Sequence, residues 1–327
     1  MADQGEQLAS SSDTTAWRGT EDNMDDPEEV KVVFYALDSF SQYPKVAHFN
    51  VTHLRRRSFY ALPQAHWKML AAPPFNFLET LDRTDDAIDA NAELARAIVA
   101  HGLRSFHNLA AVSPQGEPMI PLEWTGVAKH GDIDKARSTI RQFYRDWTAE
   151  GAVERDICYA PILNTLEQER ARIGEERQPK VLVPGAGLGR LVFELCRKGY
   201  EAEGNEISYH QLLASSYILN ECQTEGKYTI YPWIHTFSNH LTRANHLRSY
   251  KVPDIHPATT LAKTANAGSM SIFELSNDEV MALLEKLGFT VEWKQTGIET
   301  PYIQDSESML HTVYKAAAWV ARKPKQE

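Results

Sequence analysis

The sequence predicts an α/β protein in which a doubly wound sheet follows a helical region. Residues 180–222 read in the order strand, helix, strand and helix, which is how a doubly wound sheet begins. Residues 28–172 show apolar side chains at helical spacing, interrupted by Pro and Gly. Hydrophobic residues make up 43% and charged residues 24% of the 327 residues, which is typical of a globular protein.

The net charge of −10 comes mainly from the N-terminal end of the chain. Residues 1–27 are rich in Asp, Glu, Ser and Thr with few apolar side chains, which predicts a disordered acidic tail. The remainder is nearly neutral, which argues against nucleic acid as the main partner. We interpret the short basic run Arg55–Arg57 as a solvated helix face, with a nucleic-acid or nuclear-import patch as the alternative.

Neither a membrane helix nor a secretory signal is visible in the sequence. No stretch approaches the roughly 18 consecutive apolar residues of a membrane span, and the N-terminus lacks a cationic start before an apolar core. We therefore expect a cytoplasmic protein, with nuclear access as an option, and no membrane partner. Cys158, Cys196 and Cys222 are odd in number and far apart, which favours buried thiols over disulfides or zinc ligands.

The most regular helix pattern covers about residues 132–150. Its apolar positions form one stripe at helical spacing: Ile133, Ala136, Ile140, Phe143, Tyr144 and Trp147. Gln142 and Arg145 lie opposite this stripe. The pattern alone makes both of them ordinary solvated residues, unless a ligand lies against the polar face.

The sheet pattern begins at residues 180–184, which predict a short buried strand, and continues with a helix over 188–198 and a strand over 199–206. Near the C-terminus, Ser276 and Glu279 predict a capped helix through Leu287, followed by two strands. Residues 238–271 contain no four-residue run of β-branched or aromatic side chains. We therefore expect the central strands to be absent, either because the fold is abbreviated or because part of the chain is missing.

Gly185, Gly187 and Gly189 lie between a predicted strand and helix, where glycine lets backbone approach a ligand closely. The spacing GxGxG differs from the GxGxxG of dinucleotide folds, which favours a cofactor with an adenosine and an amino acid. Glu206 ends the next strand, where a carboxylate can accept both ribose hydroxyls. The alternatives are a tight turn without ligand and a surface glutamate that caps the next helix.

The remaining motifs carry less chemistry. Residues 231–235 (YPWIH) are aromatic, which favours core packing over a ligand wall. We predict no metal site, because no recognisable ligand spacing includes the nearby histidines His235, His240, His246 and His256. The sequence contains no GxSxG elbow, Walker loop or catalytic Cys and His pair, which argues against hydrolases and kinases.

Three motifs, VLVPGAGLGRL (181–191), GYEAEGNEISY (199–209) and YTIYPWIHTFSN (228–239), resemble the S-adenosylmethionine-dependent carnosine N-methyltransferases of the N2227-like group. The resemblance extends over nearly all of the chain after the acidic tail. It implies a Rossmann-like class I methyltransferase domain at residues 176–327 behind a helical region at residues 28–175. It also implies S-adenosyl-L-methionine as the cofactor.

The resemblance further implies methyl transfer to the histidine imidazole of carnosine, a small dipeptide, which gives anserine; related histidine-containing peptides are other acceptors. Gln142 and Arg145 would clamp the cofactor carboxylate, which reverses the interpretation from the pattern. Gly185 would line the methionine, and Glu206 would hold the ribose. The acceptor dipeptide would lie beside two tyrosines, Tyr302 and Tyr314.

The chain departs from the family after Ser271. There the family continues with a GDF-type adenine loop, a strand that ends in FxDTAHN, and an LKPGG strand that leads to GPLLxH, whereas this chain passes directly to Ile272. We expect lost or severely weakened activity, and we assign no catalytic residue. The first strand would have an exposed edge, or the terminal strands would pair there. The alternative function is an inactive remnant that acts as an interaction or dimerisation module, such as a homodimer.

Overall fold

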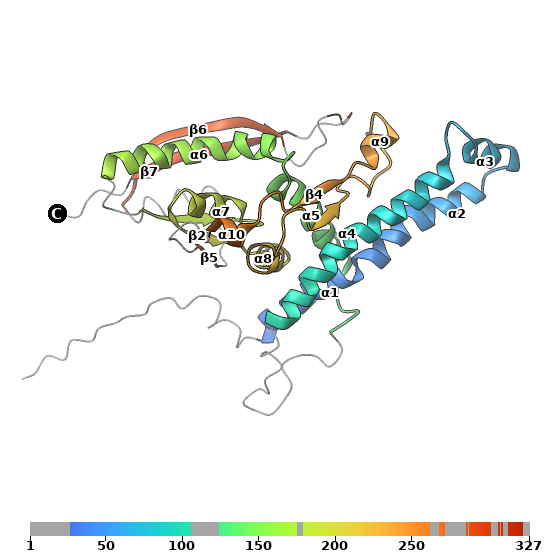
Figure 1. The fold of residues 1–327 in the computed structure, drawn as a ribbon, viewed down its shortest axis with the longest axis horizontal. Helices are drawn as coiled ribbons and strands as arrows, with labels where there is room; N and C mark the ends of the chain where they lie inside the picture. Colours follow the sequence, from blue (N-terminus) through green and yellow to red (C-terminus); the bar gives the residue numbers. More distant parts are fainter. Residues whose placement is uncertain are drawn as a thin grey trace, which may run out of the picture.

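The computed structural model describes residues 27–105, 124–174, 179–261, 268–271, 288–301 and 313–322, together with residues 286, 307 and 309. Helices and small sheets are mixed in it, which is compatible with the predicted α/β class (Figure 1). The acidic tail and the capped helix near residues 276–287 lie almost wholly outside the described residues.

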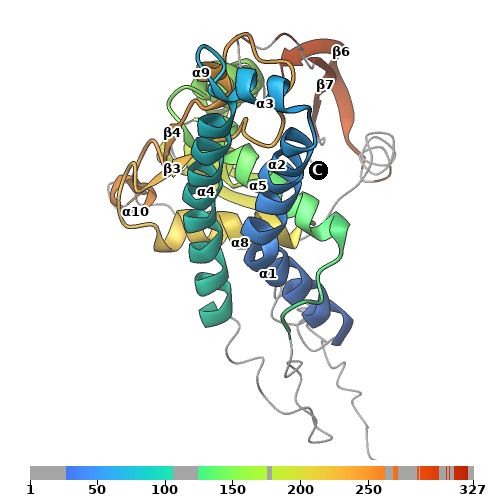
Figure 2. The same cartoon turned by 90° about the vertical axis from the view of Figure 1, so that its right-hand side faces the viewer.

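The first part of the predicted helical region, from α1 to α4, forms a long arm. Helices α1 (Pro27–Ala47) and α4 (Phe77–Ser105) lie side by side along it, and α3 (Gln64–Ala71) is at its end (Figure 2). Both helices place apolar side chains at helical spacing on the facing sides, and these are at most 2% exposed: Val30, Val33, Phe34, Leu37 and Phe40 in α1, and Leu81, Ile88, Ala92, Ala95 and Ile98 in α4. This contact is part of the main hydrophobic core.

Helix α5 (His130–Trp147) completes the main core with the apolar stripe that its sequence predicts. Ala136, Ile140, Phe143 and Trp147 are fully buried. The short antiparallel strands β3 (Tyr228–Ile230) and β4 (Tyr250–Val252) pack into the same core. The helix is therefore held between the arm and the C-terminal half of the chain.

The glycine-rich segment belongs to a small parallel sheet with the order β1–β2–β5. Strand β1 (Lys180–Pro184) connects to β2 (Glu201–Asn205) through α7 (Arg190–Arg197), and β5 (Gly268–Ser271) pairs with the far side of β2. A second, smaller core lies between α7 and this sheet. It contains Leu191, Val192, Leu195, Cys196, Tyr200 and Ala202.

The remaining elements surround this sheet and the main core. Strands β6 (Thr290–Pro301) and β7 (Val313–Arg322) form an antiparallel hairpin, and α6 (Ala152–Ile173) runs along it (Figure 1). Arg322 in β7 pairs with Glu169 in α6 at 2.8 Å. The shorter elements are α2 (Leu54–Tyr60), α8 (Tyr209–Ser216), α9 (Arg243–His246), α10 (Pro257–Leu261) and the π-helices η2 (His48–His53) and η4 (Tyr217–Glu221).

The expectation that the first strand is buried is wrong. Strand β1 is not buried: Leu182 is 57% exposed. Within the described residues, β1 pairs with β2 on one side and has no partner on the other. Within the described residues, strands β6 and β7 pair with each other and not with β1. Residues 238–271 also contain two short strands, β4 and β5, although neither has a pronounced β pattern.

The prediction of buried thiols is confirmed for two of the three cysteines. Cys196 and Cys222 are buried free thiols, whereas Cys158 is partly exposed. Within the described part of the chain, no helix combines the length and apolarity that a bilayer span requires. The basic run does not form one surface, because Arg56 pairs with Asp82 and Asp85 whereas Arg55 lies over an aromatic ring.

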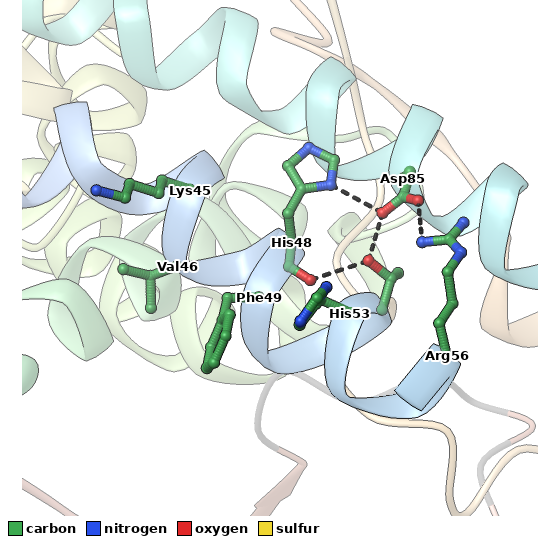
Figure 3. Close-up of a pocket in the computed structure, with 8 residues that line it drawn as sticks. Lys45, Val46, His48, Phe49, His53, Arg56 and Asp85 are labelled. Atoms are coloured by element: carbon green, nitrogen blue, oxygen red, sulfur yellow. Dashed lines mark hydrogen bonds and ion pairs between the residues drawn. The ribbon is translucent and has the colours of Figure 1, made fainter. Parts of the chain in front are cut away.

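The π-helix η2 interrupts the arm and borders a surface pocket of about 580 Å³ (Figure 3). His48 is held there between two carboxylates of α4, Asp85 at 2.8 Å and Asp89 at 2.9 Å. Burial disfavours the charged imidazole, but the bonds to Asp89 and Asp85 outweigh burial and raise the pKa of His48. Residues that line the pocket do not overlap with the residues that the sequence assigns to a cofactor.

The buried histidines predict a loss of stability in mild acid. Burial lowers the pKa of His210 and His246 to about 4 and that of His235 to about 3, whereas unfolded histidine titrates near pH 6.5. Between these values the unfolded chain binds more protons, so the free energy of unfolding falls by up to about 1.4 kcal/mol per pH unit for each histidine. His48 acts in the opposite direction, because its raised pKa contributes stability below about pH 6.5 that is lost as the pH rises through its folded value.

Three histidines with strongly lowered pKa values destabilise the folded chain in acid, and His48 alone among these four acts the other way. We therefore expect the urea midpoint at pH 5 to be lower than at pH 7. Urea unfolding followed by circular dichroism at both pH values measures this. An unchanged or higher midpoint at pH 5 would contradict the burial of these three side chains.

Candidate functional site

The glycine-rich loop passes from β1 into α7 beside the end of β2. Pro184 and Asn205 are paired at the ends of the two strands, and the Ala186 N–H donates to the backbone oxygen of Asn205 at 2.8 Å. Gly185 and Gly187 have φ angles of +66° and +59°, a region that favours glycine over other residues. The strand pairing and the glycines together bring the loop next to Glu206.

Glu206 is 7% exposed and holds the loop through its carboxylate. One carboxylate oxygen, Oε2, accepts from the Gly187 N–H, and the other, Oε1, accepts from the Ser208 N–H, both at 2.8 Å. A carboxylate has about four acceptor positions. Two backbone donors therefore leave acceptor capacity for further hydroxyl groups. The alternative of a surface glutamate is wrong, because this side chain is buried.

Helix α5 brings Gln142 to the other side of the loop. A Cβ atom at Gly187 would lie 3.0 Å from Nε2 of Gln142 and 3.0 Å from Oε1 of Gln211, so a larger residue does not fit there without displacement. Gln142 is 5% exposed. Its interpretation as a solvated residue is therefore wrong, because the loop covers the polar face of α5.

Asp146 orients both polar residues of α5 that the sequence singles out. Its carboxylate is 2% exposed and accepts from Nε2 of Gln142 at 3.1 Å and from Nε of Arg145 at 2.7 Å. The Arg145 side chain is 22% exposed. A guanidinium carries five N–H donors, so Arg145 can serve a second acceptor beside Asp146.

A buried ionic cluster fixes α5 against the start of α7. Asp254 accepts from Arg190 at 2.5 and 3.1 Å and from Arg155 at 3.2 Å. Both arginines also donate to backbone oxygens near the end of α5, including that of Asp146, which is 3.0 Å from Arg190. Trp147 donates from Nε1 to the Leu188 oxygen in the loop at 3.0 Å. These contacts set the distance between Gln142 and the loop.

The residues present fit a polar ligand that carries an adenosine and an amino acid. A Cβ atom at Gly185 would meet nothing within 4 Å, so space is open beside its backbone. Asn205 Oδ1, one residue before Glu206, is a buried acceptor without a partner among the described groups, which is rare in folded proteins unless a ligand or water completes the bond. At Gly189 a Cβ atom would lie 2.9 Å from Leu219, so a larger residue does not fit there without displacement.

Three residues at the site were missed by the sequence reasoning: Asp146, Gln211 and Asp254. The i, i+4 spacing of Gln142 and Asp146 is a local signal that permits a side-chain bond on a helix. Gln211 and Asp254 offer no such signal, because their partners lie far away in the sequence.

The structure describes little of the two proposed acceptor tyrosines. Tyr302 lies outside the described residues, and Tyr314 is in β7, where its backbone is paired with Thr300. Trp233 and Ile234 are buried in the main core, as the core-packing interpretation of residues 231–235 expects. Among the residues that the structure describes, no group of three or more His, Cys, Asp or Glu side chains could hold a metal ion.

Comparison with known proteins gives consistent matches. The family model for Carnosine N-methyltransferase matches residues 122–272 and 260–325. A carnosine N-methyltransferase of Mus musculus is 36% identical over 224 residues, which cover 68% of this chain and 53% of the mouse protein. The Schizosaccharomyces pombe relative of the same name is 36% identical over 246 residues, which cover 74% of this chain and 62% of the yeast protein. The carnosine N-methyltransferase unmet of Drosophila melanogaster is 31% identical over 276 residues, with 60% of each chain covered.

The chain spans about half the length of the mouse relative that it matches. The alignment with the fly protein is 276 positions long but includes only 60% of the 327 residues of this chain. It therefore contains positions of the fly protein that have no counterpart in this chain. The two segments of the family match overlap at residues 260–272. Because the family model matches more than half of the sequence, the chain belongs to the carnosine N-methyltransferase family.

Proposed function

We propose that this chain is an S-adenosylmethionine-dependent N-methyltransferase that acts on the histidine imidazole of carnosine and gives anserine. The observation that carries the proposal is the contact series from Gln142 to Gly187 to Glu206, which joins an amide, a glycine loop and a buried carboxylate. The names of the relatives supply the acceptor. Related histidine-containing peptides are further acceptors.

The residues of the site would hold the cofactor at its two polar ends. S-adenosylmethionine, when bound, supplies an electrophilic methyl group. The Glu206 carboxylate would accept the ribose hydroxyls, since its two backbone donors leave acceptor positions. Gln142 and Arg145, both fixed by Asp146, would bind the carboxylate of the cofactor.

The acceptor side of the reaction needs positioning more than covalent help. An imidazole with a pKa near 6.5 is mostly neutral above pH 7 and carries a free nitrogen lone pair. The chain has to hold that nitrogen in line and exclude water. We assign the border of the acceptor to Tyr302 and Tyr314, on the family resemblance.

The proposal includes a Rossmann-like domain at residues 176–327 that lacks an internal block near residues 271–272, behind a helical region at residues 28–175 and an acidic tail at residues 1–27. The parallel order β1–β2–β5 supports such a sheet. The two-part family match and the gapped fly alignment support the missing block. Since that block carries family contacts to adenine and acceptor, we expect weak activity. A cytoplasmic location, with nuclear access as an option, is part of the same proposal.

Mass spectrometry of a reaction with carnosine and S-adenosylmethionine tests the proposal. We expect a product one methyl group heavier, formed by the chain and not by its Glu206→Gln variant. Competition between carnosine and a histidine-containing peptide identifies the preferred acceptor. Absence of product at high enzyme concentration, from a chain that binds S-adenosylhomocysteine, would contradict the assigned acceptor.

The second candidate function is an inactive interaction or dimerisation module. The exposed edge of β1 favours it, because unpaired strand edges bind other chains, and Leu182 on this strand is 57% exposed. Light scattering with and without S-adenosylhomocysteine separates the two functions. A dimer that does not bind the cofactor product supports the module, whereas a chain that binds it supports the enzyme.

A further inference from the structure

The amide of Gln142 has both of its hydrogens in use within the protein. Nε2 donates one of them to Oδ2 of Asp146 at 3.1 Å and the other to Oε1 of Gln211 in α8 at 3.4 Å. The proposed function requires one of these hydrogens, because a carboxylate such as that of the cofactor only accepts hydrogen bonds. The cofactor can therefore bond to Nε2 of Gln142 only if it displaces Asp146 or Gln211.

The orientation of the two amide groups follows from their neighbours. The Asp146 carboxylate has no hydrogen to donate, so Gln142 must turn Nε2 toward it and not Oε1. Gln211 must then turn its oxygen toward the same nitrogen, because two amide NH₂ groups do not bond to each other. Both hydrogens of Gln142 are therefore committed by the chemistry of the neighbouring groups.

The bond to Asp146 is the stronger of the two. It ends on a charged acceptor that is 2% exposed and also bonded to Nε of Arg145 at 2.7 Å. The bond to Gln211 joins two neutral amides at 3.4 Å, beyond the usual range of about 2.7–3.2 Å. Gln211 is only partly buried, so water can bond to its amide after displacement. Gln211 is therefore the partner that a ligand displaces.

The contact between the two amides lies against the glycine loop. A Cβ atom at Gly187 would be 3.0 Å from Nε2 of Gln142 and 3.0 Å from Oε1 of Gln211. The N–H of Gly187 donates to Glu206, as does that of Ser208. The backbone oxygen of Ser208 in turn accepts from the Gln211 N–H at 2.9 Å. Gln211 is thus held between the residues that we assign to the two polar ends of the cofactor.

We propose that Gln211 is an internal competitor of the cofactor, which lowers the affinity by taking the hydrogen of Gln142 that the cofactor carboxylate requires. Binding breaks the hydrogen bond between the two amides and forms one from Gln142 to the ligand. Gln211 acts through Gln142 and not by contact with the ligand. This inference rests on the proposed function, since it requires that Gln142 binds the carboxylate of S-adenosylmethionine.

Calorimetric titration of the full chain with two ligands tests the competition. S-adenosylhomocysteine has the amino-acid carboxylate, whereas adenosine has only the ribose and the base. The proteins are the wild type, Gln211→Met, which has similar length but no acceptor oxygen, and Gln211→Glu, whose acceptor is charged. We expect Gln211→Met to bind S-adenosylhomocysteine about threefold more tightly than the wild type, and Gln211→Glu about tenfold more weakly. Adenosine should bind equally to all three proteins.

The direction of the change separates competition from a structural role. Loss of a merely structural contact would weaken binding, whereas loss of a competitor strengthens it. Gln223→Met and Gln223→Glu are the matched controls, because Gln223 is exposed in the loop before β3. Both controls should bind the two ligands like the wild type. Thermal unfolding of each variant without ligand shows whether its fold is retained.

Two results would overturn the competition. One is equal or weaker binding of S-adenosylhomocysteine by Gln211→Met than by the wild type. The other is a gain of the same size with adenosine, because adenosine has no carboxylate for Gln142. Binding of neither ligand by any of these proteins is a distinct result, which would overturn the proposed function and this inference with it.

Discussion

Replacing Asp254 with alanine is expected to lower the free energy of unfolding by about 3–5 kcal/mol, because it leaves two arginines buried without their shared carboxylate. The side chains of Arg155 and Arg190 are each 6% exposed and that of Asp254 is 12% exposed. The three groups join the end of α5 to the start of α7. Loss of these contacts should also displace Gln142 from the glycine loop. Urea unfolding measures the stability change.

The matched control is Asp134→Ala, which removes an exposed partner of Arg137 at 3.2 Å. A surface pair of this kind contributes at most about 1 kcal/mol. A cost for Asp254→Ala that is no larger than that of Asp134→Ala would contradict the structural role of the ionic cluster.

Replacing Glu206 with glutamine is expected to weaken binding of S-adenosylhomocysteine about 100-fold. The variant loses the negative charge that strengthens the hydrogen bonds proposed with the ribose hydroxyls. Each such charge-assisted hydrogen bond contributes about 1.5–3 kcal/mol. It also turns an amide NH₂ toward Gly187 or Ser208, whose N–H groups are both donors to the native carboxylate. Calorimetric titration of the wild type and the variant gives the two dissociation constants.

Glu201→Gln provides the control for the Glu206 variant, since it removes the same charge from strand β2, which Glu206 directly follows. Glu201 is exposed and pairs with Lys180 at 2.8 Å. We expect this control to bind S-adenosylhomocysteine like the wild type. Equal affinity for the Glu206 and Glu201 variants would show that Glu206 does not contact the ligand.

The local part of the site could be predicted from the sequence. Strand, glycine loop, helix, strand and Glu206 follow one another within residues 180–206, so the strand pairing that brings the loop to the carboxylate depends on a short stretch of chain. Helix α5 and its apolar stripe were predictable for the same reason. The family resemblance added Gln142 and Arg145, which the pattern alone had assigned to solvent.

The remaining features depend on contacts between distant residues. Gln142 is buried because a loop that follows much later in the chain covers it, and helical spacing carries no information on that cover. Asp254 lies in a stretch without pronounced periodicity, yet its carboxylate joins two helices. Strand β1 has the apolar composition of a buried strand but an exposed Leu182, because burial of a strand depends on what covers the faces of its sheet as well as on its own residues.

The central claim is that this chain builds a site for S-adenosylmethionine. A thermal unfolding scan of the purified chain, with and without saturating S-adenosylhomocysteine, tests it most directly, because a ligand that binds the folded state raises the midpoint. We predict one cooperative transition that shifts upward with the ligand in the wild type and shifts less in Glu206→Gln. A cooperative transition at the same temperature with and without the ligand would contradict the claim and leave the interaction module as the function of this chain.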